Sequence, residues 1–276
     1  MADKNLPLVT VVVPTYNNER TIEACLKSVA CQAYPKIELV VVDNYSTDRT
    51  KEIACKYGTV MTKGPERSSQ RNYGAMLGHG EYVLFTDSDT ELAPDVVDAC
   101  VKAAEGTRAN AVIVSQISKG ESFWAKCKIL EKMCYIGDSM IEAAQFFNRQ
   151  AFLEEGGFDE AIAGGGEDWD VPLRLLKRGF RIARVRPLIV HNEGNLLLSH
   201  TVRKKYYYGK TVPRYVRKHP IVARAQFIPV RMAFIRNWRS LVSDPLHACG
   251  LFLMKFCEFV AGALGIVSSI RLRHEL

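Results

Sequence analysis

The short segment Asp87-Ser88-Asp89 contains the clearest potential for metal chemistry in this sequence. Two carboxylates, Asp87 and Asp89, stand two residues apart at the end of the apolar run 82–86. Side chains alternate between the two faces of an extended chain, so these carboxylates point the same way. Mg²⁺ and Mn²⁺ prefer such oxygen ligands and often share them with substrate phosphates. The alternative is that these residues only form a turn that caps the next helix.

A second acidic cluster follows three consecutive glycines, 164–166, and comprises Glu167, Asp168 and Asp170. Carboxylates this close raise one another's pKa, so their clustering indicates a role such as binding a cation or acting as a catalytic base. A general base is one such role, and a helix N-cap is the alternative for Asp168 or Asp170. His191 ends a later strand and is either a third metal ligand or a structural histidine.

Alternating strands and helices must position these groups. Strands are predicted at 9–13, 37–42, 59–61, 82–86, 111–114, 145–148 and, as one or two strands, at 181–190. Helices are predicted around 22–29, 46–58, 68–77 and 123–135, after Pro94, and at the second acidic cluster, with Pro172 in the first turn and Gly179 at the end. This order predicts an α/β fold, a Rossmann-like and mostly parallel central sheet flanked by helices. Ligands of such sheets bind beyond the carboxyl ends of the strands, where Pro14, Asp43 and Asp87 fall.

Composition places the chain among globular proteins, with 276 residues, 47% of them hydrophobic and 24% charged. We expect a catalytic domain over 1–199 and a basic, helical extension over 200–276. The eight cysteines form no Cys-x-x-Cys pair, which indicates reduced thiols rather than zinc or disulfides. The apolar run 8–13 is too short for a secretory signal. Together these features predict a cytoplasmic protein.

Several motifs in fixed order make the sequence resemble the family 2 glycosyltransferases, inverting enzymes of the GT-A fold. The likeness covers about residues 7–195, and no core motif departs from the pattern. The matching residues are Val11-Val-Val-Pro-Thr-Tyr-Asn17, Val41-Val-Asp43 with Ser46 and Asp48, Arg71-Asn-Tyr-Gly74, Asp87-Ser-Asp89, Gly156-Gly-Phe-Asp-Glu160, Gly166-Glu-Asp-Trp-Asp170 and His191.

The resemblance implies transfer of a sugar, with inversion, from a UDP- or GDP-linked donor to an acceptor hydroxyl. It implies Asp168 as the catalytic base and a divalent metal, Mn²⁺ or Mg²⁺, held by Asp87, Asp89 and His191. The resemblance places Thr15, Tyr16 and Glu19 near the base and ribose, with Asp43 hydrogen-bonded to the base, and it places Arg71 and Asn72 near the diphosphate. Asp87 would meet the ribose or the metal, His191 would complete the metal or diphosphate contacts, and Glu167 and Trp169 would shape the acceptor and donor sugar site. Pro14 and Ser88 are the remaining expected substrate-binding residues.

The C-terminal part differs from the rest in charge. Residues 1–199 carry 23 Lys and Arg against 27 Asp and Glu, whereas residues 200–276 carry 14 against 3. Tyrosines interleave with the basic residues of 200–220. Three interpretations fit this pattern: a solvated helix face, a nucleic-acid surface, and a surface for a phosphorylated lipid acceptor or an anionic membrane. We expect the third, with a lipid-linked or other membrane-proximal glycan as acceptor and a peripheral location on the cytoplasmic face of the membrane.

The apolar segment 246–270 supports the membrane interpretation, because a helix there presents one narrow polar stripe and one wide apolar face. Its final charge-free run, 259–270, is too short to span a bilayer. A helix docked on the body is the alternative.

Two other functions compete with glycosyl transfer. A sugar nucleotidyltransferase would also have a Rossmann-like sheet and a metal, but we expect it to carry a glycine-rich, basic loop after the first strand, which residues 14–18 lack. A nucleic-acid-binding module using residues 200–240 would leave Asp87, Asp89, Glu167 and Asp168 without a role. We therefore expect no nucleic-acid partner.

Overall fold

The computed structural model describes residues 6–162, 164–228 and 231–274. The chain forms two compact units. Unit 1 combines Met1–Ser115, Ala143–Glu160 and Asp168–His191, and unit 2 combines Gln116–Glu142, Ala161–Glu167 and Asn192–Leu276. The division expected from the sequence, at residue 199, stays a prediction about domains.

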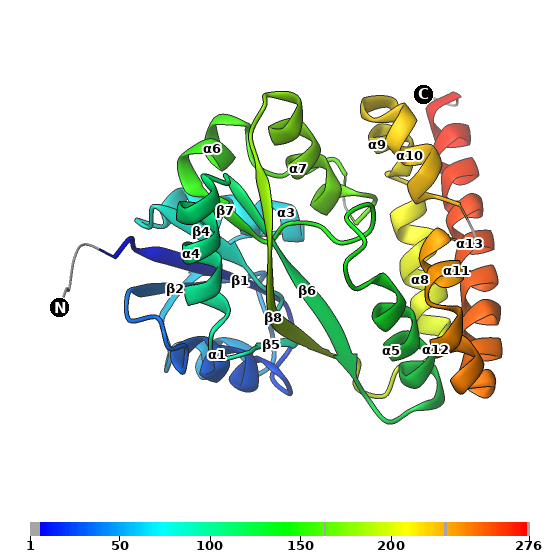
Figure 1. The fold of residues 1–276 in the computed structure, drawn as a ribbon, viewed down its shortest axis with the longest axis horizontal. Coiled ribbons are helices and arrows are strands. Elements are labelled where there is room, and N and C mark those ends of the chain that lie inside the picture. Colours follow the sequence, from blue (N-terminus) through cyan, green and yellow to red (C-terminus); the bar gives the residue numbers. More distant parts are fainter. Residues whose placement is uncertain (1–5, 163, 229–230, 275–276) are drawn as a thin grey trace. The chain divides into compact units, whose positions relative to one another are not determined.

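Within the described ranges, eight strands form one sheet in the order β3-β2-β1-β4-β7-β6-β8-β5 (Figure 1). Strand β1 (Val9–Thr15) pairs in parallel with β2 (Ile37–Asp43) and β4 (Tyr82–Phe85), and β2 pairs in parallel with β3 (Thr59–Thr62). The antiparallel strands are β7 (Phe146–Asn148), between β4 and β6 (Ala111–Lys119), and β5 (Thr90–Leu92), beside β8 (Ile182–Asn192). The predicted α/β fold with a mostly parallel sheet is confirmed.

Alternation along the strands creates two helical layers, one on each face of the sheet. Val11 and Val13 of β1 pack in one apolar cluster, and Val12 packs in the other. The first cluster includes α1 (Ile22–Ala30), α2 (Thr50–Ala54) and α4 (Val96–Thr107), and the second includes α3 (Arg67–Leu77), α6 (Arg149–Glu154) and α7 (Glu167–Lys177). Both strand faces are therefore buried, which explains the continuous apolar runs in the sequence.

Three local predictions need correction. Helix α2 begins at Thr50 rather than near Ser46, because the side chains just before it bind a neighbouring loop. Pro172 lies inside α7 rather than in its first turn, since the helix already begins at Glu167. Without a proline N–H, the carbonyl of Asp168 receives no helical hydrogen bond. The short elements β5 and α6 were not predicted, because they are too brief to show a periodic pattern.

Unit 2 is built from helices, with α5 (Phe123–Tyr135), α8 (Leu198–Gly209) and α13 (Pro245–His274) as its longest members. Helix α13 runs alongside α8 and also contacts α5 (Figure 1). Four short helices complete the extension: α9 (Val212–Lys218), α10 (Pro220–Gln226), α11 (Met232–Arg236) and α12 (Trp238–Ser243). The unit's buried core includes Cys127, Leu130, Phe234, Leu251 and Met254.

Candidate active site

Three loops at the carboxyl edge of the sheet are joined by side-chain hydrogen bonds. The backbone N–H of Asn17 donates to Ser46 Oγ at 2.8 Å, and Asn17 Oδ1 accepts from the N–H of Thr47 at 2.8 Å. Asn18 Nδ2 donates to Ser88 Oγ at 2.7 Å. Asn17 adopts a left-handed conformation, with φ of 45°, which asparagine tolerates better than most residues. The loops after β1, β2 and β4 therefore form one connected rim.

Beside this rim lie buried polar atoms that have no hydrogen-bond partner among the described residues. They are Asp43 Oδ1, Thr15 Oγ1 and Ser68 Oγ. Asp43 and Thr15 are register partners on β2 and β1. Gln70 of α3 donates to the Thr15 carbonyl at 3.0 Å, which links α3 to these strand ends. Unpaired buried polar atoms are costly, so this group indicates a place where a polar ligand binds.

Arg71 joins two acids that the sequence separates widely. Its Nη2 lies 2.7 Å from Asp87 Oδ1, and its Nη1 lies 2.8 Å from Asp168 Oδ1. The Arg71 side chain is only 6% exposed, and its guanidinium lies 5.3 Å from the ring centre of Phe158. Burial would raise the pKa of Asp87, but Arg71 and then Arg67 outweigh burial and hold that pKa far below its ordinary 3.8.

The crowded acids of α7 have different surroundings. Asp170 is fully buried and pairs with Arg174 at 2.9 Å. Glu167 is 2% exposed. The Asp168 side chain is 47% exposed, and it faces Arg71. Of the three, Asp168 is thus the acid that a substrate can reach.

Asp89 and His191 come together at adjoining strands, as the metal prediction requires. His191 Nε2 lies 3.3 Å from Asp89 Oδ2. Asp87 instead directs its carboxylate to Arg71 and Arg67. Within the described ranges, no three His, Cys, Asp or Glu residues gather closely enough to hold a metal ion by themselves. The assignment of Asp87, Asp89 and His191 as metal ligands stays a prediction.

Two predicted substrate-binding residues make structural contacts. Glu19 Oε2 accepts from the backbone N–H of Arg49 at 3.0 Å, so it ties the loop after β1 to α2. Asn72 binds Phe158 through both ends of its amide, donating to the carbonyl at 2.9 Å and accepting from the N–H at 2.8 Å. The ligand-binding roles of Glu19 and Asn72 stay predictions.

The other predicted residues differ in exposure. Pro14 is buried near the end of β1, Trp169 is half-buried, and Tyr16 is 60% exposed at the rim. Ser88 is buried, and its hydroxyl accepts from Asn18.

Sequence reasoning missed Arg67 and Gln70. Arg67 lies on the same face of α3 as Arg71, four residues earlier, and Arg67 Nη1 lies 3.6 Å from Asp87 Oδ2. Gln70 donates to the carbonyls of Thr15 and Val42 at the strand ends. The signal was present in the run Arg67-Ser-Ser-Gln-Arg71, because residues four apart are neighbours on a helix.

Sequence reasoning also missed two tyrosines of unit 2 that pack on the glycines before the acidic cluster. A Cβ added to Gly164 would lie 2.1 Å from the ring of Tyr208, and one added to Gly166 would lie 2.8 Å from the ring of Tyr215. Gly166 also has φ of 125°, which disfavours other residues. Tyr215 is fully buried and donates to Gln226 Oε1 at 2.6 Å. These tyrosines therefore fix the backbone that leads into α7.

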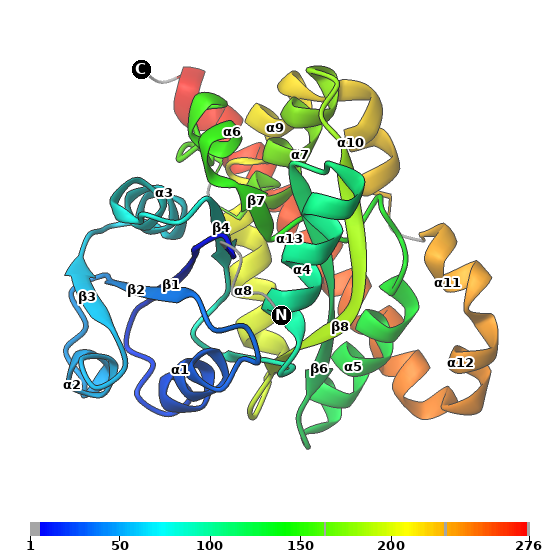
Figure 2. The same ribbon diagram turned by 60° about the vertical axis from the view of Figure 1, so that its left-hand side comes forward.

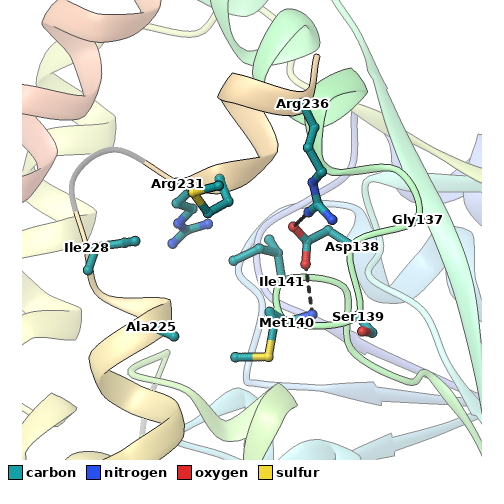
Figure 3. Close-up of a pocket in the computed structure, with 10 residues that line it drawn as sticks. Gly137, Asp138, Ser139, Met140, Ile141, Ala225, Ile228, Arg231 and Arg236 are labelled. Atoms are coloured by element: carbon teal, nitrogen blue, oxygen red, sulfur yellow. Dashed lines mark hydrogen bonds and ion pairs between the residues drawn. The ribbon is translucent and has the colours of Figure 1, made fainter. Parts of the chain in front are cut away.

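A separate cavity of about 440 Å³ lies within unit 2 (Figure 3). Arg231 and Arg236 line it, and Arg236 pairs with Asp138. Met140 and Ile141 add apolar surface. None of the site residues predicted from the sequence lines this cavity.

A Rossmann-like sheet flanked by helices, with polar groups at its carboxyl edge, places the chain among the α/β proteins, and comparison with known proteins specifies the family. The family model described as glycosyl transferase family 2 matches residues 10–153. The chain belongs to this family, as its motifs predicted.

Similar proteins agree with this membership. Glycosyltransferase GlyA of Streptococcus pneumoniae is 33% identical over 144 residues, which are 49% of this chain and 20% of GlyA. The chain thus spans only a fifth of the length of that relative. Mannosyltransferase PcManGT from Pyrobaculum calidifontis, in complex with GDP-Man and Mn²⁺, superposes with a TM-score of 0.67 and 21% identity, over 95% of this chain and 87% of PcManGT. The structure of S. aureus TarS 1–349 with UDP-GlcNAc superposes with a TM-score of 0.52 and 16% identity, over 96% of this chain and 92% of that chain. These likenesses confirm the GT-A fold.

Proposed function

We propose that this glycosyltransferase transfers a sugar, with inversion, from a nucleoside-diphosphate sugar to an acceptor hydroxyl. The observation that carries the proposal is the Arg71 bridge, which brings Asp87 of the β4 loop and Asp168 of α7 to one guanidinium. Family membership supports it, as do the buried polar atoms of Asp43 and Thr15 that find no hydrogen-bond partner in the described part of the chain. GDP-Man and UDP-GlcNAc, bound by the structural neighbours, are the first donors to test.

The residues fit a divalent cation. Asp89 Oδ1 is buried without a hydrogen-bond partner among the described residues, and Asp89 Oδ2 lies beside the His191 imidazole. A carboxylate and an imidazole suit Mn²⁺ or Mg²⁺, which commonly completes its ligand set with substrate phosphates. Asp87 would join them only on leaving its arginine partners. When bound, such a metal supplies Lewis-acid stabilisation of the leaving diphosphate.

The chain's own residues supply the other steps. Asp168 accepts the proton of the acceptor hydroxyl as that oxygen forms a bond to the anomeric carbon, and the bond from this carbon to the diphosphate oxygen breaks. Proton removal of this kind contributes about 10²–10⁴-fold. Asp43 and Thr15 bind the nucleoside, and Arg71 orients Asp168 and adds positive charge near the diphosphate. Glu167 and Trp169 shape the sugar site.

The acceptor proposed here is a hydroxyl on a lipid-linked or other membrane-proximal glycan. Its support is the strongly basic extension, with 14 Lys and Arg against 3 Asp and Glu in residues 200–276. An anionic acceptor, or an acceptor at an anionic surface, would be attracted to such a segment.

A thermal-shift panel of nucleotide sugars, each with Mn²⁺, Mg²⁺ or EDTA, tests the donor proposal. A donor at about 100 times its Kd adds about 2.7 kcal/mol to the free energy of unfolding. We expect one donor to raise the melting temperature with Mn²⁺, and Asp89→Asn to remove the metal-dependent part of that rise. Mn²⁺ binding followed by electron paramagnetic resonance checks the metal without turnover. Equal shifts with metal and with EDTA would contradict the metal assignment.

A further inference from the structure

The exposed side of α13 is an unbroken apolar stripe. Ten exposed residues recur at spacings of one or three along the helix: Leu246, Cys249, Phe252, Leu253, Phe256, Phe259, Val260, Ala263, Leu264 and Val267, followed by Ile270 at the end. At 1.5 Å per residue the stripe is about 36 Å long. Soluble proteins rarely expose an apolar surface of this extent unless a partner or a membrane covers it.

The opposite side of α13 is joined to the rest of unit 2 by buried ion pairs. Lys255 Nζ lies 2.9 Å from Glu131 Oε1 of α5 and 2.8 Å from Glu258 Oε2 of its own helix. Lys128 of α5 lies 2.6 Å from Glu131 Oε2. Glu131 and Glu258 are 2% and 4% exposed. Breaking a buried pair by removing one partner is strongly unfavourable, so these ions hold α13 in place.

Glycines bring α13 close to α8. A Cβ added to Gly265 would lie 2.2 Å from the Tyr206 carbonyl oxygen, and one added to Gly209 of α8 would lie 2.3 Å from the Gly262 carbonyl oxygen. The two backbones are therefore in contact. Helix α13 is long and apolar enough to cross a membrane by length and composition. This helix is longer than the charge-free run 259–270, because Lys255 and Glu258 do not interrupt it.

The neighbouring helices add cations to this apolar surface. Helices α11 and α12 expose Ile235, Trp238 and Val242 together with Arg239, and also Arg236, whose charge is paired with Asp138. The Arg239 guanidinium lies 5.8 Å from the ring centre of Trp238. Tryptophan with arginine beside exposed aliphatic side chains is typical of segments at the boundary between lipid headgroups and acyl chains. The charge favours an anionic lipid surface over a neutral partner.

We propose that unit 2 binds an anionic membrane with α13 lying in the membrane plane, its apolar stripe among the acyl chains and its charged side on α5 and α8. A spanning orientation would place the Lys255–Glu131 pair, and α5 with it, at the depth of the hydrocarbon core, where ionised groups are costly. The proposal concerns unit 2 alone and does not depend on the proposed sugar transfer.

Vesicle co-sedimentation of the full chain tests the surface. We expect binding to vesicles of phosphatidylcholine with phosphatidylglycerol, and weaker binding to phosphatidylcholine alone. Phe256→Glu with Leu264→Glu should lower the partition coefficient by about 10-fold or more, since both side chains lie on the stripe. Met76→Glu, an equally exposed apolar position on α3, is the matched control and should bind like the parent. Circular dichroism checks that each variant folds.

Two further measurements distinguish the in-plane helix from a spanning helix and from a stripe covered by a second copy of the chain. Tryptophans placed at 246, 256 and 264 should be quenched by brominated lipids at one shallow depth; deep quenching at 256 alone would show a spanning helix and overturn the in-plane orientation. Light scattering in solution detects a second copy of the chain on the stripe. The proposal is overturned if the parent does not bind vesicles. It is also overturned if the parent forms a dimer that vesicles leave intact and that the double glutamate variant does not form.

Discussion

At the residue scale, the site is an arrangement of charges around Arg71. One buried guanidinium serves Asp87 and Asp168, and it lies against the ring of Phe158. Arginine suits this role because its planar group offers several donors and stays charged at any physiological pH. A lysine would have to bring both carboxylates to a single nitrogen, whereas Arg71 holds them at two separate nitrogens, Nη2 and Nη1.

Asp168→Asn is expected to retain donor binding and to lose turnover by about 10²-fold or more, because an amide cannot accept the hydroxyl proton. Calorimetry with the nucleotide sugar and a product assay measure the two effects separately. Asp98→Asn, which removes an exposed pair with Lys102, is the control. Near-normal turnover of the Asp168 variant would place the base elsewhere.

At the element scale, the helices of unit 2 are joined by buried ions and by close backbone contact. Burial would raise the pKa of Glu131, but the ammonium groups of Lys128 and Lys255 hold that pKa well below 4.5. Tyr135 also donates to Glu131, at 2.9 Å. Removal of this carboxylate would leave two cations facing a neutral group in a buried site.

Glu131→Gln should lower the free energy of unfolding at neutral pH by about 3–5 kcal/mol. Because the folded-state pKa is lowered, the unfolded chain binds the proton more readily, so this contribution is complete above about pH 4.5 and is lost as the pH falls further. Denaturant titrations of parent and variant should therefore differ at neutral pH and converge in acid. A difference that is constant over this range would contradict the assigned ion pair.

Gly166→Ala should reduce turnover by about 10-fold or more and destabilise the protein by about 1–3 kcal/mol, since alanine disfavours this φ and meets the Tyr215 ring. The matched control is Gly106→Ala in α4, where a Cβ meets nothing within 4 Å. The control should be neutral or slightly stabilising. Steady-state kinetics and thermal unfolding measure both variants. If the Gly166 variant matches the Gly106 control in turnover and stability, Tyr215 does not have the proposed role.

At the scale of the whole molecule, charge is divided unevenly along the chain. Residues 1–199 have more acids than bases, and residues 200–276 have a large excess of bases. An anionic surface would therefore attract the C-terminal part selectively, and the attraction would weaken as salt screens it.

Arg239→Gln should weaken binding to anionic vesicles by about 1 kcal/mol at low salt, and the loss should shrink at high salt. The matched control is Arg108→Gln, an exposed arginine at the end of α4. Flotation assays over a range of salt concentrations measure both. Identical binding of parent and variant at low salt would show that Arg239 does not face the lipid.

The sequence by itself determined the family, the α/β sheet and most strand and helix positions, because apolar periodicity and turn residues act locally along the chain. It also identified Asp87, Asp89, Asp168 and His191 as the groups to examine, since residue type and spacing limit the chemistry available. Only the tertiary structure decided that Asp87 pairs with Arg71, that Asp170 is buried with Arg174, and that Tyr208 and Tyr215 pack on the glycines. Those outcomes depend on contacts between residues far apart in the chain, and burial and direction of a side chain follow from such contacts rather than from its neighbours in sequence.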